Sequence, residues 1–168
     1  SDIAAMGGLP SYAMLTVAAD FSDKRIGKEW IGKFMRAAAR EADRWSISIC
    51  GGDVSGCRGK AVFTLSIAGW VEKGKLCLRS GARDGDRLFA TGRFGNSFAS
   101  GHHLNFIPRL QEARFLAGKF THAMIDVSDG LLSDARQIAK ASGIGVEIFT
   151  DKIPLRKGAG LAQAMGEG

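Results

Sequence analysis

The chain is poor in cysteine and proline and has no long hydrophobic run. Its three cysteines, Cys50, Cys57 and Cys77, are an odd and widely spaced set in 168 residues. This spacing predicts neither a disulfide framework nor a zinc site, and it fits a reducing cytoplasm best. No stretch approaches the roughly 20 apolar residues of a membrane helix. The first residues also lack the basic segment and apolar run of a signal peptide. We therefore expect a cytoplasmic protein that does not contact a membrane.

Several common functional motifs are also missing. The sequence contains no phosphate-binding loop ending in Gly-Lys-Ser/Thr, no Gly-x-Gly-x-x-Gly and no Gly-x-Ser-x-Gly. His102 and His103 are adjacent, which is not the helical spacing of two metal ligands. The net charge of +6 is spread along the chain. Nucleic-acid binding is favoured by basic residues that cluster among aromatic side chains, so we expect no nucleic-acid partner.

What is present is the composition of a globular protein, with 45% hydrophobic and 24% charged residues. Apolar residues every three or four positions predict a helix over 26–45, and Pro108, Gly118 and Gly143 delimit two more. β-Branched and alternating segments predict strands. The mixture does not alternate strictly, so it indicates an α+β fold with mixed sheets and packed helices. The other predicted helices cover 109–117 and 128–142, and the predicted strands cover 11–19, 46–50, 61–72, 87–91, 123–127 and 145–149.

The turn-rich segment 79–86 marks a change in composition, so we place a domain boundary beside it. The expected domains are 1–77 and 78–168. The chain opens on what resembles the end of a helix, residues 2–6, stopped by Gly7-Gly8. We therefore expect a piece of a longer protein in which both domains are incomplete.

The sharpest local signal is an acidic cluster at the end of a predicted strand. Asp126 and Ser128 are two positions apart and would face the same way on a strand, and Asp129 follows at the start of a helix. Such oxygen ligands suit Mg²⁺. The alternative is that Ser128 or Asp129 only caps the helix. Capping does not explain Asp126, a charge in an apolar segment where burial without a partner is costly.

Three weaker signals lie elsewhere. Gly52 and Asp53 follow the predicted strand 46–50, where glycine lets a backbone approach a ligand closely. This could equally be an ordinary turn. Arg79 stands in a loop of small residues and could hold a phosphate with its planar guanidinium, or could simply lie at the surface. Asp2, taken alone, is an exposed acid on a helix.

Together, these segments resemble one family. Residues 1–10 (SDIAAMGGLP), 51–53 (GGD), 78–82 (LRSGA) and 125–132 (IDVSDGLL) are similar, in this order, to motifs of the thiamine-monophosphate kinases. The similarity spans nearly the whole chain, and the combination is far more specific than any single motif.

The resemblance implies a two-domain fold of the aminoimidazole ribonucleotide synthetase superfamily. Members usually form a homodimer through the N-terminal domain and hold ATP between the domains. The implied reaction passes the γ-phosphoryl group of ATP to thiamine monophosphate, giving thiamine diphosphate and ADP. By resemblance, the Mg²⁺ ligands would be Asp2, Asp53, Asp126 and Asp129, and the ATP contacts would be Gly52, Asp53, Arg79 and Ser128.

Two alternatives stay within the superfamily. One is a different ATP-using enzyme, similar to selenophosphate synthase or to a hydrogenase-maturation protein. The other is a relative that binds nucleotide without turnover. We expect the 168-residue piece by itself to be inactive.

Overall fold

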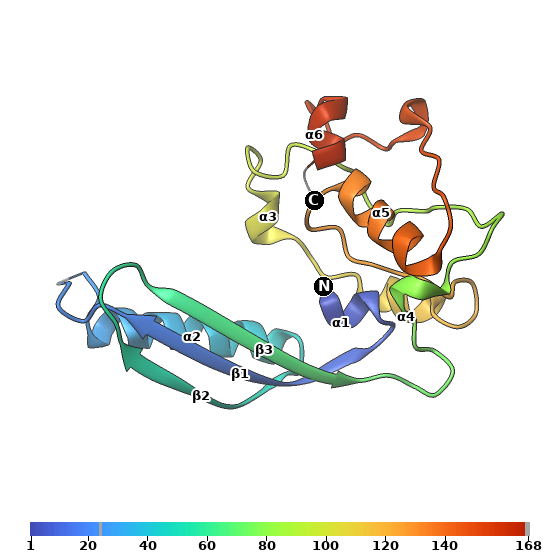
Figure 1. Cartoon of the computed structure of the whole chain (residues 1–168). Helices are drawn as coiled ribbons and strands as arrows, with labels where there is room; N and C mark the ends of the chain where they lie inside the picture. The colour runs from blue at the N-terminus through green and yellow to red at the C-terminus, as the bar shows by residue number, and fades with distance from the viewer. Residues whose placement is uncertain (24, 167–168) are drawn as a thin grey trace. The chain divides into compact units, whose positions relative to one another are not determined.

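The computed structural model describes residues 1–23 and 25–166, and Lys24, Glu167 and Gly168 lie outside the described residues. The chain divides into two compact units (Figure 1). One unit is residues 9–70. The other combines residues 1–8 with residues 71–168.

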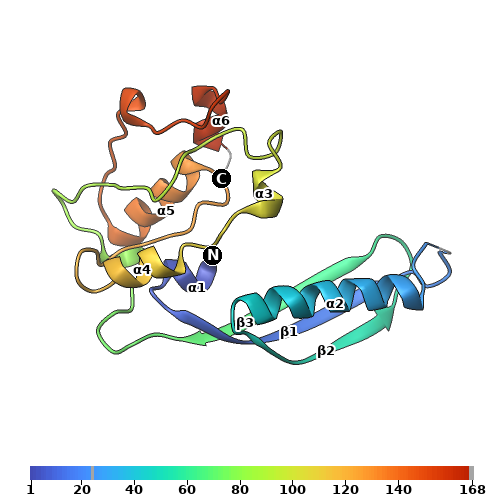
Figure 2. The same ribbon diagram turned by 180° about the vertical axis from the view of Figure 1, so that it is seen from behind.

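The unit of residues 9–70 is a three-stranded sheet with one long helix. Strand β1 (Leu9–Ala19) is central, β2 (Ser48–Gly56) pairs with it in parallel and β3 (Val62–Trp70) pairs with it antiparallel. Helix α2 (Lys28–Arg44) lies along one face of this sheet (Figure 2). Mixed pairing together with a packed helix confirms the α+β class.

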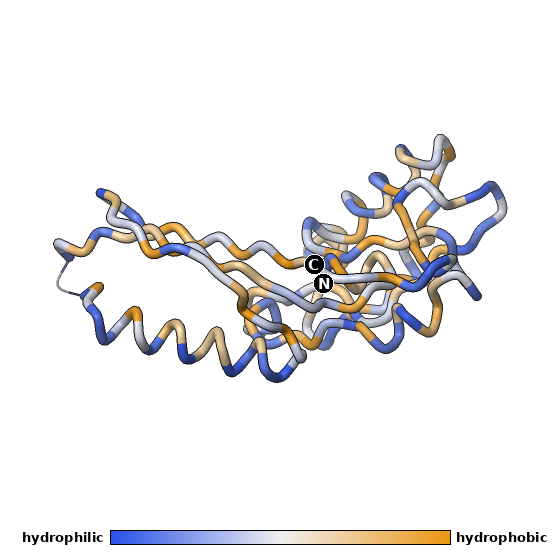
Figure 3. Tube along the Cα trace, turned by 90° about the horizontal axis from the view of Figure 1, so that it is seen from below, coloured by the Kyte–Doolittle hydropathy of each residue, from blue (hydrophilic) through white to orange (hydrophobic). Residues whose placement is uncertain are grey.

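Helix α2 follows the pattern predicted over 26–45. Its apolar positions recur every three or four residues, and Figure 3 shows hydrophobic and hydrophilic positions alternating along it. Trp30 and Phe34 stack with ring centroids 5.9 Å apart, and the ring of Phe34 lies 4.9 Å from that of Phe63 in β3. This aromatic contact attaches the helix to the sheet.

The central strand β1 has two different faces. Ala13, Leu15, Val17 and Ala19 alternate along it and are buried, and Val17 is paired with Phe63 on the side of α2. Of the intervening residues, Tyr12 and Met14 are more than half exposed, and Thr16 and Ala18 are partly buried. The face away from α2 is thus left uncovered within this unit.

The second unit consists of short helices joined by long irregular segments. Its core contains Phe94, Leu131, Ile153 and Ala164. Strand-like pairing in its described residues is limited to isolated bridges, such as the one between Leu78 and Ala123. Its elements are α1 (Asp2–Ala5), η1 (Arg79–Gly81), α3 (His102–Asn105), α4 (Leu110–Leu116), α5 (Leu131–Ser142), η2 (Thr150–Lys152) and α6 (Leu161–Gly166).

The structure corrects three predicted strands in this unit. Residues 87–91, 123–127 and 145–149 form no strand. A strand requires a neighbour that accepts and donates its ladder hydrogen bonds. These segments lack a ladder in the described part of the chain, and Phe89 is 84% exposed. An apolar, β-branched composition therefore did not suffice to predict pairing.

The predicted helices are confirmed with shifted ends. The helix predicted over 109–117 is α4, and the one predicted over 128–142 is α5, which begins only at Leu131. Gly143 ends α5 in the left-handed conformation at φ 69°, as a C-terminal glycine does. Among the described residues, no helix is both long enough and apolar enough to span a bilayer.

Candidate functional site

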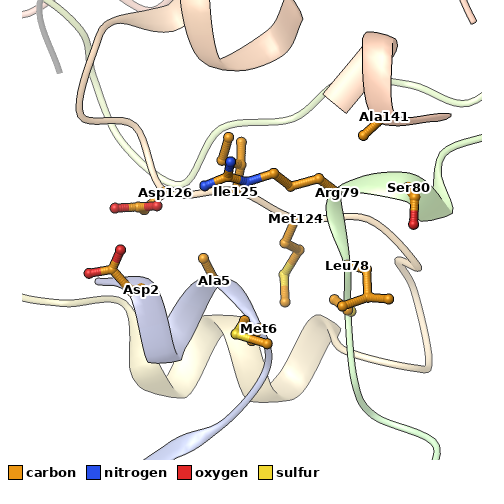
Figure 4. Close-up of a pocket in the computed structure, with 11 residues that line it drawn as sticks. Asp2, Ala5, Met6, Leu78, Arg79, Ser80, Met124, Ile125, Asp126 and Ala141 are labelled. Carbon is orange, nitrogen blue, oxygen red and sulfur yellow. The ribbon is translucent and has the colours of Figure 1, made fainter. Parts of the chain in front are cut away.

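A pocket of about 440 Å³ forms where three segments of the second unit meet (Figure 4). The segments are α1, the stretch around η1, and the extended stretch that precedes α5. The lining residues are Asp2, Ala5, Met6, Cys77, Leu78, Arg79, Ser80, Met124, Ile125, Asp126 and Ala141.

The end of α1 is fixed against the η1 segment by a glycine turn. Gly7 has φ +75°, and a side chain there would come within 2.7 Å of the Lys75 carbonyl oxygen. The amide of Gly8 donates a hydrogen bond to the Ile3 carbonyl at 3.0 Å, which ends the helix. The amide of Cys77 then donates to the Met6 carbonyl at 3.2 Å. These contacts set the position of Asp2 on the short helix relative to Arg79.

The η1 segment is equally close to the segment that carries Asp126. Leu78 forms a parallel bridge with Ala123. A Cβ atom on Gly81 would lie 2.1 Å from the His122 carbonyl oxygen, so only glycine permits this approach. Arg79 and Asp126 therefore line the same pocket although they are far apart in sequence.

The charged groups of the pocket are two acids and one arginine. Figure 4 shows the carboxylates of Asp2 and Asp126 turned toward each other, with the guanidinium of Arg79 on the same side of the pocket. Facing carboxylates are hard oxygen donors of the kind Mg²⁺ prefers. Among the described residues, no group of three or more His, Cys, Asp or Glu side chains could hold a metal ion. The donor chemistry fits a Mg²⁺ ion held by two carboxylates and completed by ligand oxygens.

Ser128 and Asp129 do not cap α5. The N-cap is Gly130 at φ +100°, and it makes no side-chain capping bond. Instead, the backbone amides of Ser128 and Asp129 donate to Oδ2 of Asp134, at 3.0 and 3.1 Å. The interpretation of Ser128 or Asp129 as a helix cap was therefore wrong. The two backbone amides are held by the carboxylate of Asp134, which lies in the first turn of α5.

Asp134 is the residue that the sequence analysis missed. Asp134 lies in the first turn of α5 and is only 2% exposed. The signal in the sequence was its position, because Leu131, Asp134, Ala135 and Ala139 form one buried stripe at helical spacing. A carboxylate on an apolar stripe requires hydrogen-bond or charge partners, because burying it without them is costly, and the same reasoning applied to Asp126.

The pocket arginine is also attached to α5. Nη1 of Arg79 donates to Oε1 of Gln137 at 2.7 Å, and Nε2 of Gln137 donates to Oδ1 of Asp134 at 3.1 Å. Ser142, at the end of the helix, donates its hydroxyl to the Arg79 carbonyl at 2.9 Å and accepts the Ala82 amide at 3.2 Å. One helix thus holds both the side chain and the backbone of Arg79.

Gly52 and Asp53 belong to the other unit. The predicted strand ended at Cys50, but β2 continues to Gly56, so both residues lie inside a strand and not in a turn after it. Asp53 is exposed, pairs with Thr16 in the register and accepts a hydrogen bond from the Ser55 hydroxyl. Gly52 lies directly against the Leu15 carbonyl. The structure thus brings Asp2, Arg79 and Asp126 to one pocket, and Gly52 and Asp53 to a different unit.

Comparison with known proteins gives two family matches and several close relatives. Residues 1–71 match the model of the AIR synthase related protein N-terminal domain, and residues 79–167 match that of the C-terminal domain. A thiamine-monophosphate kinase of Rhodopirellula baltica is 37% identical over 160 residues, which are 95% of this chain and 49% of that protein. The chain spans about half the length of the curated relatives it matches.

Solved structures share the fold. A solved structure of AaThiL complexed with AMPPCP and TMP has a TM-score of 0.83 at 24% identity, and the match covers 99% of this chain and 61% of the AaThiL chain. The hydrogenase maturation protein HypE of Escherichia coli has a TM-score of 0.79 at 18% identity, covering 99% and 59%. Together with the two family matches, these similarities confirm the predicted aminoimidazole ribonucleotide synthetase-like fold.

Proposed function

We propose, given that the chain belongs to the AIR synthase related protein family, that the whole protein is a thiamine-monophosphate kinase. It would transfer the γ-phosphoryl group of ATP to thiamine monophosphate, giving thiamine diphosphate and ADP. The observation that carries the proposal is the pocket shared by Asp2, Arg79 and Asp126. The curated relatives, at 28–37% identity, bear the name of this kinase, and a solved structure of the same fold contains AMPPCP and TMP.

The roles of the residues follow from the charge of the reactants. Phosphoryl transfer depends on alignment and on neutralised charge more than on a covalent nucleophile. Asp2 and Asp126 would hold Mg²⁺, which supplies positive charge to the transferring phosphate when bound. Arg79 would hold a phosphate oxygen through its guanidinium. The remaining roles are assigned by resemblance: Asp53 and Asp129 as further Mg²⁺ ligands, and Gly52, Asp53 and Ser128 as nucleotide contacts.

The second candidate is another ATP-using reaction of the same fold, because the HypE structures are also similar. Their identities of 16–18% concern the fold alone, whereas the kinase relatives reach 37% over 95% of the chain. The acceptor therefore separates the candidates. Turnover with thiamine monophosphate favours the kinase, and ATP binding without turnover favours a binding-only relative.

The proposed assembly is a cytoplasmic homodimer with domains 1–77 and 78–168. The dimer would form through the uncovered face of the sheet, where Tyr12, Met14 and Val62 are 57%, 53% and 57% exposed. In the register, Met14 pairs with Ser66 and Ala18 pairs with Val62, which places these apolar side chains on the face away from α2. Apolar side chains gathered on one sheet face are suited to packing against a second copy.

The test is a kinase assay of the whole protein that carries this sequence. With MgATP and thiamine monophosphate, we expect ADP and thiamine diphosphate in equal amounts, and no product when EDTA removes the metal. Asp126→Asn should lower kcat/KM by about 100-fold or more, because even partners outside the ligand shell are worth 10–100-fold. Asp151→Asn is the matched control, since Asp151 is exposed in η2 and does not line the pocket. Full activity of the Asp126 variant, or ADP formation without thiamine diphosphate, would refute the proposal.

A further inference from the structure

A continuous hydrogen-bonded chain links the pocket arginine to the loop before α5. It runs from Arg79 through Gln137 to Asp134, and from Asp134 to the amides of Ser128 and Asp129. The bonds are 2.7, 3.1, 3.0 and 3.1 Å long, which is normal for nitrogen donors and oxygen acceptors. The only member that is almost completely buried is Asp134, at 2% exposure.

The direction of every bond in this chain is fixed by its ends. An arginine side chain only donates, and an ionised carboxylate only accepts. The residue between them must therefore accept at one end and donate at the other. A glutamine amide does so when its oxygen faces Arg79 and its nitrogen faces Asp134, as found here. Neither a second acid nor a second base could replace Gln137 without placing like groups against each other.

The helix supplies the spacing. Asp134 and Gln137 are three positions apart, so their side chains lie next to each other on one side of α5. Asp134 is in the first turn of the helix, from which it reaches back to the two amides. The last residue of α5, Ser142, holds the backbone at the first residue of η1, Arg79, and at Ala82 directly after η1.

We propose that Asp134 and Gln137 are positioning residues that hold the guanidinium of Arg79 and the Ser128–Asp129 loop as one preorganised edge for the phosphates of a nucleotide. This inference rests on the proposed function for the identity of the ligand. Neither residue lines the pocket, so each acts through the groups it holds. The guanidinium carries several N–H donors, so one bond to Gln137 orients it and leaves donors for a phosphate. Fixing these groups before binding removes the entropy cost of ordering them on the ligand.

The test exchanges hydrogen-bond donors for acceptors at positions 134 and 137. In Asp134→Asn, the new amide oxygen can still accept the two backbone amides, but its NH₂ group then faces the NH₂ group of Gln137. In Gln137→Glu, two carboxylates face each other. In the double variant, the introduced asparagine donates to the introduced glutamate, which in turn accepts from Arg79. The double variant restores alternating donors and acceptors at an unchanged net charge.

Three measurements on the whole protein apply to each variant: kcat and KM for MgATP, the melting temperature, and amide hydrogen exchange of residues 128 and 129. Each single change should raise KM about 10-fold and speed the exchange of the two amides by a similar factor. The double variant should return both values to within about threefold of the wild type. Arg136→Gln changes one exposed charge on the same helix and should change neither value.

The outcomes separate this inference from the kinase proposal. If the effects of the single changes add in the double variant, the chain of bonds has no positioning role, even when the wild type phosphorylates thiamine monophosphate. If the exchange rates show rescue but the wild type makes no thiamine diphosphate, the connection between Arg79 and the loop stands and the kinase proposal fails. Lowered melting temperatures with unchanged KM would make Asp134 and Gln137 merely structural and would overturn the inference.

Discussion

Replacing Gly52 tests how closely β2 approaches β1 in the sheet, and the same replacement at the neighbouring Gly51 serves as the control. A Cβ atom added at Gly52 would lie 1.9 Å from the carbonyl oxygen of Leu15 and 2.8 Å from its carbonyl carbon. Real Cβ atoms essentially never come within 3.0 Å of a heavy atom outside their own residue and its two chain neighbours. The Gly52→Ala substitution would therefore force β1 and β2 apart by about 1 Å. The same substitution at Gly51 meets only the Met14 sulfur, at 4.0 Å.

The size of the effect follows from what must move. Overpacking a well-packed site costs about 1–3 kcal/mol, and here the obstacle is backbone and not a flexible side chain. We therefore expect Gly52→Ala to lower the free energy of unfolding by about 3 kcal/mol. For a chain of this length, each kcal/mol lowers the melting temperature by about 2–4 °C, so the expected loss is about 6–12 °C. Gly51→Ala should stay within about 0.5 kcal/mol of the wild type.

The assay is thermal unfolding of the two variants and the wild type without nucleotide, followed by circular dichroism. The absence of nucleotide matters, because a glycine needed only for ligand approach would cost no stability in the free protein. Equal melting temperatures of the two variants would refute the carbonyl argument. A normal melting temperature together with lost ATP binding for Gly52→Ala would instead favour the role assigned by resemblance.

Three further outcomes follow from burial and charge. Burial raises the pKa of the Cys77 thiol, and Cys77 is only 1% exposed. Iodoacetamide at pH 8 should therefore label the exposed Cys50 and leave Cys77 unmodified, which mass spectrometry measures. Met14→Glu, which places a charge on the uncovered sheet face, should convert the proposed dimer to a monomer in light scattering without lowering the melting temperature by more than about 2 °C. A hydrogen bond from Lys75 lowers the pKa of Glu72. The stability that this ion pair contributes is therefore present above the usual carboxyl pKa of 4.5 and is lost as the pH falls through the lowered pKa. Lys75→Met should raise the pKa of Glu72 in an NMR titration.

Helices α2, α4 and α5 could be predicted from the sequence because their signals are local, whereas the short helices α3 and α6 were not predicted. The 26–45 pattern produced α2, and Pro108, Gly118 and Gly143 marked the bounds of α4 and the end of α5 to within two residues. Strand pairing depends on residues far away in the chain, and three of the predicted strands failed for this reason. The β1–β2 pairing also carried β2 six residues beyond its predicted end at Cys50.

The candidate site was predicted in part. The resemblance selected Asp2, Arg79 and Asp126, and the structure places all three on one pocket. Their roles as ligands stay predictions, as do those of Asp53 and Asp129. Asp134 escaped notice because an acid in the first turn of a helix is an ordinary finding. Only the fold shows that it is buried and that backbone amides converge on it.

The division of the chain into units has a consequence for its engineering. Residues 9–70 leave and re-enter the rest of the chain at neighbouring positions, since Leu9 pairs with Trp70 in the sheet. The two junctions of this segment with the rest of the chain therefore lie side by side. Loop insertions within residues 9–70 would leave the two junctions side by side, and every residue that lines the pocket of Asp2 and Asp126 lies outside this segment.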